Sequence, residues 1–242
     1  MILFLTSSPC TEGECRFTDR NRFEEELGQR LPWNLKLLVI SSDPDNAEFT
    51  DSFAADMAEC LYGLGYDFEN YSTLDSRNWE DALKLVRWAN LIILAGGHVP
   101  TENAFFRKIN LRHLLEKYRG VVLGISAGTM NSADTVYAMP ELEGEAADPD
   151  YDRYLTGLNL TKAMIVPHYN KIKDDVLDGM KVIDDILLKD SMDNSFFVFH
   201  DGTYLFSDGE HEEIRGEAYL AENGKLEKIC EDEETVQLEK QQ

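Results

Sequence analysis

The sequence predicts an α/β fold in which a mostly parallel sheet is flanked by helices. Short apolar runs typical of buried strands alternate with helical stretches through the first half of the chain. In the last third, Asp201-Gly202, Asp208-Gly209 and Asn223-Gly224 separate strand-like segments, which is typical of antiparallel hairpins. We find no internal repeat and no Pro/Ser-rich linker, so we expect residues 1–242 to form a single α/β domain.

Strands and helices are expected in strict alternation over the first half of the chain. Apolar runs define the strands, and helical periodicity or a following proline defines the helices. In chain order these are strand Ile2–Thr6, helix Phe23–Leu31, strand Lys36–Ile40, helix Glu48–Leu64, strand Tyr66–Tyr71, helix Trp79–Ala89, strand Leu91–Leu94, helix Thr101–Tyr118 and strand Val121–Leu123. The polar segment Ser7–Arg22 is expected to be a loop, either a lid or plain surface.

The second half of the chain is expected to contain more strands than helices. A glycine- and acid-rich loop follows Pro140 and continues through Asp152. One amphipathic helix is expected over Asp174–Leu188. The expected strands are Ala163–Val166, Phe196–Phe199, Thr203–Phe206 and Glu217–Leu220.

Composition excludes several classes of function. The 23 basic and 46 acidic residues give a net charge of −23, so binding to nucleic acid or to an anionic membrane is not expected. The four cysteines lack paired metal-ligand spacing, and we expect no metal, cofactor or disulfide framework. Without a recognisable signal peptide or transmembrane run, a cytoplasmic protein is expected, either a monomer or a homodimer.

A glycine-flanked serine follows the predicted strand Val121–Leu123. The segment Gly124-Ile125-Ser126-Ala127-Gly128 has the G-x-S-x-G spacing of a nucleophile elbow, in which a tight strand-to-helix turn projects the serine hydroxyl. Glycine is expected on both sides because a Cβ there would collide with neighbouring backbone. The same five residues are also compatible with an ordinary strand–helix turn that contains a serine.

A serine nucleophile needs a general base and a group that orients this base. His168 and His200 both follow predicted strands, at the edge where parallel sheets place their sites, and both are candidates for the base. Asp201 is a candidate for the orienting acid, although an Asp-Gly pair is also a common turn. Spacing alone leaves these alternatives open.

Glycines also follow the predicted strand Leu91–Leu94, in Ala95-Gly96-Gly97-His98. They allow backbone amides to approach a ligand closely. The amides of Gly97 and Ala127 together would form an oxyanion hole.

Four ordered motifs resemble the dipeptidase E family of serine peptidases, which is related to cyanophycinase. They are Ala95-Gly96-Gly97-His98, Gly124-Ile125-Ser126-Ala127-Gly128, Val166-Pro167-His168-Tyr169-Asn170 and His200-Asp201-Gly202-Thr203-Tyr204-Leu205. The resemblance covers about Leu91–Phe206. It implies a sheet similar to that of class I glutamine amidotransferases.

The resemblance also implies roles for individual residues. Ser126 would be the nucleophile and His168 the general base, with oxyanion donors from Gly97 and Ala127. Asp201 stands where the family carries its acidic partner, commonly a glutamate. The implied activity is hydrolysis of short peptides through an acyl-enzyme.

The resemblance further implies substrates with an N-terminal aspartate, whose side chain needs a cationic partner. Arginines follow the histidine motif in the family, whereas lysines follow it in this chain, and the two are not interchangeable. The candidates for substrate binding are His98, Asn170, Lys171 and Lys173.

Two other functions remain open from the sequence. An esterase or acyl hydrolase of a related α/β sheet would run serine, acid, histidine, with an acid such as Asp134 or Glu143. A catalytically silent, amidotransferase-like binding protein would keep the fold without using Ser126.

Overall fold

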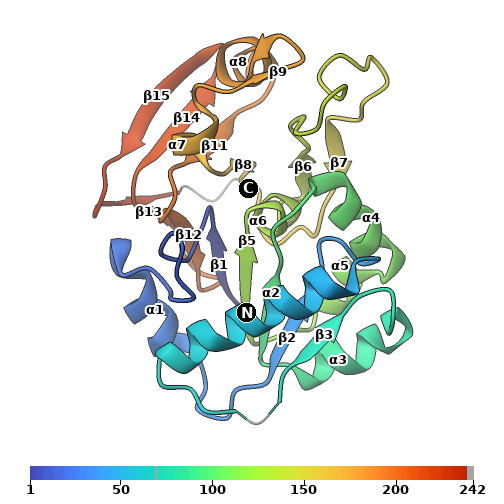
Figure 1. The fold of residues 1–242 in the computed structure, drawn as a ribbon. Helices are drawn as coiled ribbons and strands as arrows, with labels where there is room; N and C mark the ends of the chain where they lie inside the picture. The colour runs from blue at the N-terminus through green and yellow to red at the C-terminus, as the bar shows by residue number, and fades with distance from the viewer. Residues whose placement is uncertain (69, 239–242) are drawn as a thin grey trace.

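A large eight-stranded sheet forms the centre of the computed structural model, which describes residues 1–68 and 70–238 (Figure 1). In spatial order its strands are β16 (Thr235–Gln237), β13 (Glu212–Arg215), β12 (Tyr204–Ser207), β1 (Ile2–Thr6), β5 (Val121–Ile125), β4 (Leu91–Leu94), β2 (Leu37–Ile40) and β3 (Ser72–Leu74). The five strands from β1 to β3 are parallel. The other three are antiparallel. The predicted fold class is confirmed.

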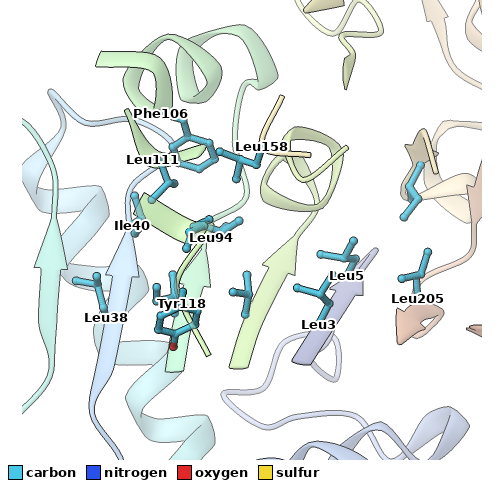
Figure 2. Packing of buried hydrophobic residues seen from close by; sticks show 14 of the residues in the cluster. Leu3, Leu5, Leu38, Ile40, Leu94, Phe106, Leu111, Tyr118, Leu158 and Leu205 are labelled. Carbon is cyan, nitrogen blue, oxygen red and sulfur yellow. The ribbon is translucent and has the colours of Figure 1, made fainter. Parts of the chain in front are cut away.

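Helices cover both faces of this sheet. Helices α1 (Phe23–Arg30) and α2 (Ala47–Gly63) pack on one face, and α3 (Ala82–Trp88), α4 (Val99–Lys108) and α5 (Leu111–Leu115) pack on the other. Because side chains alternate along a strand, each strand supplies both cores. In β2, Leu38 and Ile40 lie in the core beneath α3, α4 and α5, as Figure 2 shows. Leu37 and Val39 lie in the core beneath α1 and α2.

A smaller four-stranded sheet lies beside the large one. Its strands are β15 (Lys225–Cys230), β14 (Ala218–Glu222), β11 (Phe196–Phe199) and β8 (Ile165–Val166). A third buried cluster packs this sheet against short elements that surround the elbow. Those elements are α6 (Ala127–Asn131), α7 (Tyr169–Ile172), α8 (Leu188–Asp190) and the strand pairs β6 (Thr135–Tyr137) with β7 (Tyr154–Thr156) and β9 (Val176–Leu177) with β10 (Met180–Lys181).

Two expected elements are wrong. The described residues of Tyr66–Tyr71 do not form a strand, and residue 69 lies outside the described residues. The strand that pairs with β2 is instead β3. The expected helix Asp174–Leu188 is replaced by the β9–β10 hairpin and a π-helical segment, Val182–Leu187. Asp178 and Gly179 in the hairpin turn have positive φ angles of 52° and 80°, which interrupt the helical pattern.

Other boundaries differ in smaller ways. The expected helix Thr101–Tyr118 is divided into α4 and α5, because Asn110 between them adopts a left-handed conformation. Asp208-Gly209 and Asn223-Gly224 connect antiparallel neighbours as predicted. The turn Asp201-Gly202 does not form a hairpin, because it leads from β11 in the small sheet to β12 in the large one.

Strand order determines where a site forms. Strand β5 lies between β1 and β4, and all three are parallel, so their carboxyl ends meet at one edge of the sheet. The elbow at the end of β5 is therefore flanked by Ser7 after β1 and by Ala95-Gly96-Gly97 after β4. No helix in the described part of the chain combines the length and the apolar character needed to cross a membrane.

Candidate active site

Ser126 occupies a strained turn between β5 and α6. Its backbone angles are φ 52° and ψ −110°, outside the regions that serine normally populates. The turn is held by hydrogen bonds of 3.1 Å from the Ser126 amide to the Thr6 carbonyl and from the Gly128 amide to the Ala95 carbonyl. A Cβ at Gly128 would lie 2.4 Å from the Leu94 carbonyl oxygen, so glycine is required there by the neighbouring strand.

His168 lies within hydrogen-bond distance of Ser126. It follows β8 in a left-handed conformation, and its Nε2 is 2.9 Å from the Ser126 Oγ. Its Nδ1 is 2.6 Å from Oδ1 of Asp201. An ionised carboxylate only accepts hydrogen bonds, so the proton of a neutral imidazole belongs on Nδ1. Nε2 is then left to accept the proton of the serine hydroxyl.

Three further side chains hold Asp201 in place. Ser7 donates to Oδ1 at 2.8 Å, Asn170 donates to Oδ2 at 3.1 Å, and the Lys171 ammonium lies 3.0 Å from Oδ2. Burial alone would raise the pKa of Asp201. Hydrogen bonds from His168, Lys171 and Ser7 outweigh that effect, and they hold the pKa well below its ordinary value. Asp201 therefore stays ionised at neutral pH.

Ser7 is a site residue that the sequence analysis missed. It is fully buried, and besides contacting Asp201 its Oγ accepts a 2.8 Å hydrogen bond from the His168 amide. It is the first residue of the segment Ser7–Arg22, for which the sequence predicts only a polar loop. A signal was available, because a hydroxyl directly after β1 lies at the same sheet edge as the elbow.

The backbone amides of Gly97 and Ala127 are the two predicted oxyanion donors. In residues 1–68 and 70–238, neither N–H donates a hydrogen bond to a protein group. A Cβ at Gly97 would lie 2.4 Å from the Oγ of Ser42, which itself donates to the Gly96 carbonyl at 2.6 Å. Glycine at position 97 is thus explained by the close approach of Ser42.

The four predicted substrate-binding residues lie in different surroundings. Asn170 and Lys171 both contact Asp201, and the Asn170 Oδ1 also accepts a 2.9 Å hydrogen bond from the Asp201 amide. His98 contacts Thr101 through Nδ1 and Glu145 through Nε2, each at 2.8 Å. Lys173 is exposed, and its ammonium has no partner within the part of the chain that the structure describes.

The competing candidates do not contact Ser126 or His168. His200 turns its Nδ1 to the Asp201 carbonyl oxygen, 3.2 Å away. Asp134 forms ion pairs with Lys162 at 2.6 Å and Arg112 at 2.9 Å. Glu143 is exposed in the segment between β6 and β7. Of the candidate acids, only Asp201 contacts the histidine beside the elbow.

The segment between β6 and β7 is bound to the β9–β10 hairpin. Asp178 in the hairpin turn accepts hydrogen bonds from the amides of Gly144, at 2.8 Å, and Ala146, at 3.0 Å. Between these two residues, Glu145 contacts His98. Figure 1 shows the segment and the hairpin at one end of the molecule, beyond the carboxyl ends of the parallel strands. These hydrogen bonds therefore link a segment that follows Ser126 in the sequence to a hairpin that follows His168.

Burial of Glu145 would raise its pKa. Hydrogen bonds from the Leu142 and Glu141 amides and from His98 more than offset that effect and lower the pKa. Glu145 is therefore a firmly ionised partner for His98.

Within residues 1–68 and 70–238, no group of three or more His, Cys, Asp or Glu side chains is arranged to hold a metal ion.

Comparisons with known proteins give one sequence-family match and several similar folds. The sequence model of peptidase family S51 matches residues 41–215, well over half of the chain. No match was found among curated protein sequences. The fold is similar to that of a peptidase from an acI-B1 Actinobacterium, with a TM-score of 0.68 and 18% identity over 98% of this chain and 96% of the other. A candidate peptidase E protein from Listeria monocytogenes EGD-e gives a TM-score of 0.62 and 15% identity over 88% and 97% of the two chains.

Proposed function

Since the chain belongs to peptidase family S51 and is a serine-type peptidase of the peptidase E type, we propose that it hydrolyses short peptides with Ser126 as nucleophile, His168 as general base and Asp201 as the acid that orients His168. The observation that carries this proposal is the continuous chain of hydrogen bonds, 2.9 Å from Ser126 to His168 and 2.6 Å from His168 to Asp201. The strained backbone of Ser126 supports it, because such strain is typical of functional residues.

The proposed reaction is acyl transfer to Ser126. His168 takes the hydroxyl proton through Nε2 while Oγ attacks the peptide carbonyl carbon, and Asp201 stabilises the imidazolium that forms. The amides of Gly97 and Ala127 would stabilise the oxyanion, each by about 2.7–4 kcal/mol in comparable sites. His168 then protonates the leaving amine, and a water that it deprotonates hydrolyses the acyl-enzyme.

The restriction to short peptides is supported by the way in which the segment between β6 and β7 is held at two points. The segment between β6 and β7 is held by His98 on one side and by Asp178 on the other. Figure 1 shows this segment and the β9–β10 hairpin beyond the carboxyl end of β5. A long extended peptide would have to displace this segment, whereas a dipeptide would not.

We propose an N-terminal aspartate as the preferred first residue, following the family resemblance. Lys171 already contacts the Asp201 carboxylate, while the Lys173 ammonium has no partner among the described residues. Of the two lysines, Lys173 is therefore the one available to a substrate carboxylate.

Replacing Ser126 tests the nucleophile. Ser126→Ala should hydrolyse none of a panel of Asp-Xaa, Glu-Xaa and neutral dipeptides, and a fluorophosphonate should no longer label the protein. Ser195→Ala, with no side-chain hydrogen bond in the described part of the chain, is the matched control and should keep both properties. An active, normally folded Ser126→Ala protein would contradict the proposal.

Replacing Asp201 tests the order of the three residues. Asp201→Asn should lower kcat by about 10⁴-fold, as in serine peptidases whose orienting acid is neutralised. Near-normal activity in this variant would instead indicate a serine–acid–histidine order with a different acid.

A further inference from the structure

Three of the four cysteines line one surface hollow, and Asp201 lines the same hollow. Cys10 and Cys15 lie on the segment between β1 and α1, and Cys60 lies on α2. The Sγ atoms of Cys10 and Cys60 are 3.8 Å apart, although the residues are separated by 50 positions. The hollow has a volume of about 830 Å³, and its lining includes all three cysteines and Asp201.

The segment that carries Cys10 has a defined structure. Cys10 pairs with Phe17 in an isolated antiparallel bridge, and the Thr11 amide donates to the Arg16 carbonyl at 2.9 Å. Phe17 is fully buried against α1 and α2 residues in one of the main cores. The Cys10 thiol is therefore held facing Cys60.

From this geometry we propose that Cys10 and Cys60 are an oxidisable thiol pair, which a peroxide converts into a reversible disulfide that lowers peptidase activity. A disulfide needs sulfurs about 2.05 Å apart, so the two Sγ atoms have to approach by less than about 2 Å. Formation of this disulfide does not depend on the function proposed for Ser126, and it can be measured without any peptide substrate.

The oxidation involves two balanced steps. The Cys10 thiolate attacks one peroxide oxygen, the O–O bond breaks, and the other oxygen leaves as water or an alcohol after taking up a proton. Cys10 is then a sulfenic acid. The Cys60 sulfur attacks the Cys10 sulfur, the S–O bond breaks, and water leaves with the Cys60 proton. The two thiols are oxidised by two electrons and the peroxide is reduced by two.

The surroundings distinguish Cys10 as the thiol that reacts first. It is half-buried at the hollow, whereas Cys60 is fully buried. The hydrogen bond with Cys60 lowers the pKa of the Cys10 thiol and raises that of the Cys60 thiol. Cys15 is exposed, but partial desolvation and the nearby Asp56 carboxylate raise its pKa.

Two serines of the same segment connect Cys10 to the residues beside Ser126. Ser7, three residues before Cys10, donates to Asp201 and accepts from the His168 amide. The Ser8 carbonyl accepts a 3.2 Å hydrogen bond from the amide of Gly202. Pulling Cys10 towards α2 therefore weakens the support of Asp201, and kcat should fall while the protein remains folded.

The experiment compares reduced and peroxide-treated protein after the free thiols have been alkylated. The treated protein should lose two hydrogen atoms and carry two fewer alkyl groups, and peptide mapping should find Cys10 joined to Cys60. Its kcat should fall several-fold and return with dithiothreitol. Cys10→Ser and Cys60→Ala should both be insensitive, and Cys230→Ser, which removes a buried cysteine outside the hollow, should respond like the wild type.

Three results would overturn the proposal. Irreversible oxidation of Cys10 without a disulfide would show that Cys60 does not resolve it. A disulfide that includes Cys15 would assign the pair differently. An oxidised protein with Cys10 joined to Cys60 and an unchanged kcat would remove the coupling to Asp201. Cys10→Ser replaces a half-buried side chain by a near-isostere, so it keeps the test valid if Cys60→Ala does not fold.

Discussion

The Ser7 hydroxyl donates a 2.8 Å hydrogen bond to Oδ1 of Asp201, the same oxygen that His168 contacts at 2.6 Å. It also accepts from the backbone amide of His168. One buried side chain at the end of β1 thus fixes both the acid and the histidine beside Ser126.

We predict that Ser7→Ala lowers kcat with little change in KM, because the hydroxyl acts through Asp201 and His168. A hydrogen bond to a charged group contributes about 1.5–3 kcal/mol, which corresponds to a loss of roughly 10- to 100-fold. Steady-state kinetics with a dipeptide substrate measure this loss in kcat. Ser8→Ala is the control, since only its backbone carbonyl contacts the site. An unchanged kcat in Ser7→Ala would show that the hydroxyl is dispensable.

Lysines 171 and 173 should behave differently when each is replaced by methionine. We predict that Lys171→Met lowers kcat for Asp-Xaa and Ala-Xaa dipeptides by the same few-fold factor, because it removes support from Asp201. Its side chain is 54% exposed, and such ion pairs contribute about 0.2–1 kcal/mol. Lys173→Met should instead reduce the preference for Asp-Xaa. Loss of that preference in Lys171→Met, with Ala-Xaa unaffected, would reverse the assignment.

The elbow could be predicted from the sequence because its requirements are local. Five consecutive residues specify the turn, and the structure explains Gly128 by the nearby Leu94 carbonyl. His168 and Asp201 depended on a family resemblance, since nothing local states that the ends of β8 and β11 face β5. Ser7 was missed for the same reason. Its role depends on β1 pairing with β5, in a register that puts Thr6 opposite Ile125.

The errors in the fold have a related origin. The segment Asp174–Leu188 has helical periodicity, but Asp178 adopts a positive φ angle and bonds to amides 32 and 34 residues earlier in the chain. That long-range contact stabilises a hairpin turn that no local pattern encodes. Local propensity was outweighed by tertiary contacts.

We predict that Asp178→Ala widens the range of peptide lengths that the enzyme accepts. The substitution removes both hydrogen bonds to the segment between β6 and β7, so the hairpin no longer holds this segment in place. Relative to wild type, kcat/KM for a tetrapeptide should rise against kcat/KM for a dipeptide that shares its first two residues. Asp174→Ala, which removes an exposed carboxylate with no partner in the described part of the chain, should leave the ratio unchanged. A fixed ratio in Asp178→Ala would mean that the link does not limit length.

Glu102 on α4 provides a prediction about stability and pH. Its side chain is completely buried, its Oε2 accepts a 2.9 Å hydrogen bond from Asn131, and its Oε1 has no partner in the described residues. Burial raises the pKa well above its ordinary value, and the hydrogen bond from Asn131 does not offset this effect. Glu102 is therefore protonated in the folded protein at pH values where the unfolded chain has lost that proton.

In that pH range the unfolded state binds fewer protons than the folded state, so wild-type stability falls as the pH rises. Gln resembles the protonated acid and does not titrate. We predict that the free energy of unfolding of Glu102→Gln, relative to wild type, increases as the pH rises above the ordinary pKa of a glutamate, by up to about 1.4 kcal/mol per pH unit. Urea denaturation at several pH values measures this difference. Glu227→Gln, at an exposed position of β15, is the matched control for the change of side chain. A difference for Glu102→Gln that does not change with pH would show that Glu102 is ionised in the folded protein.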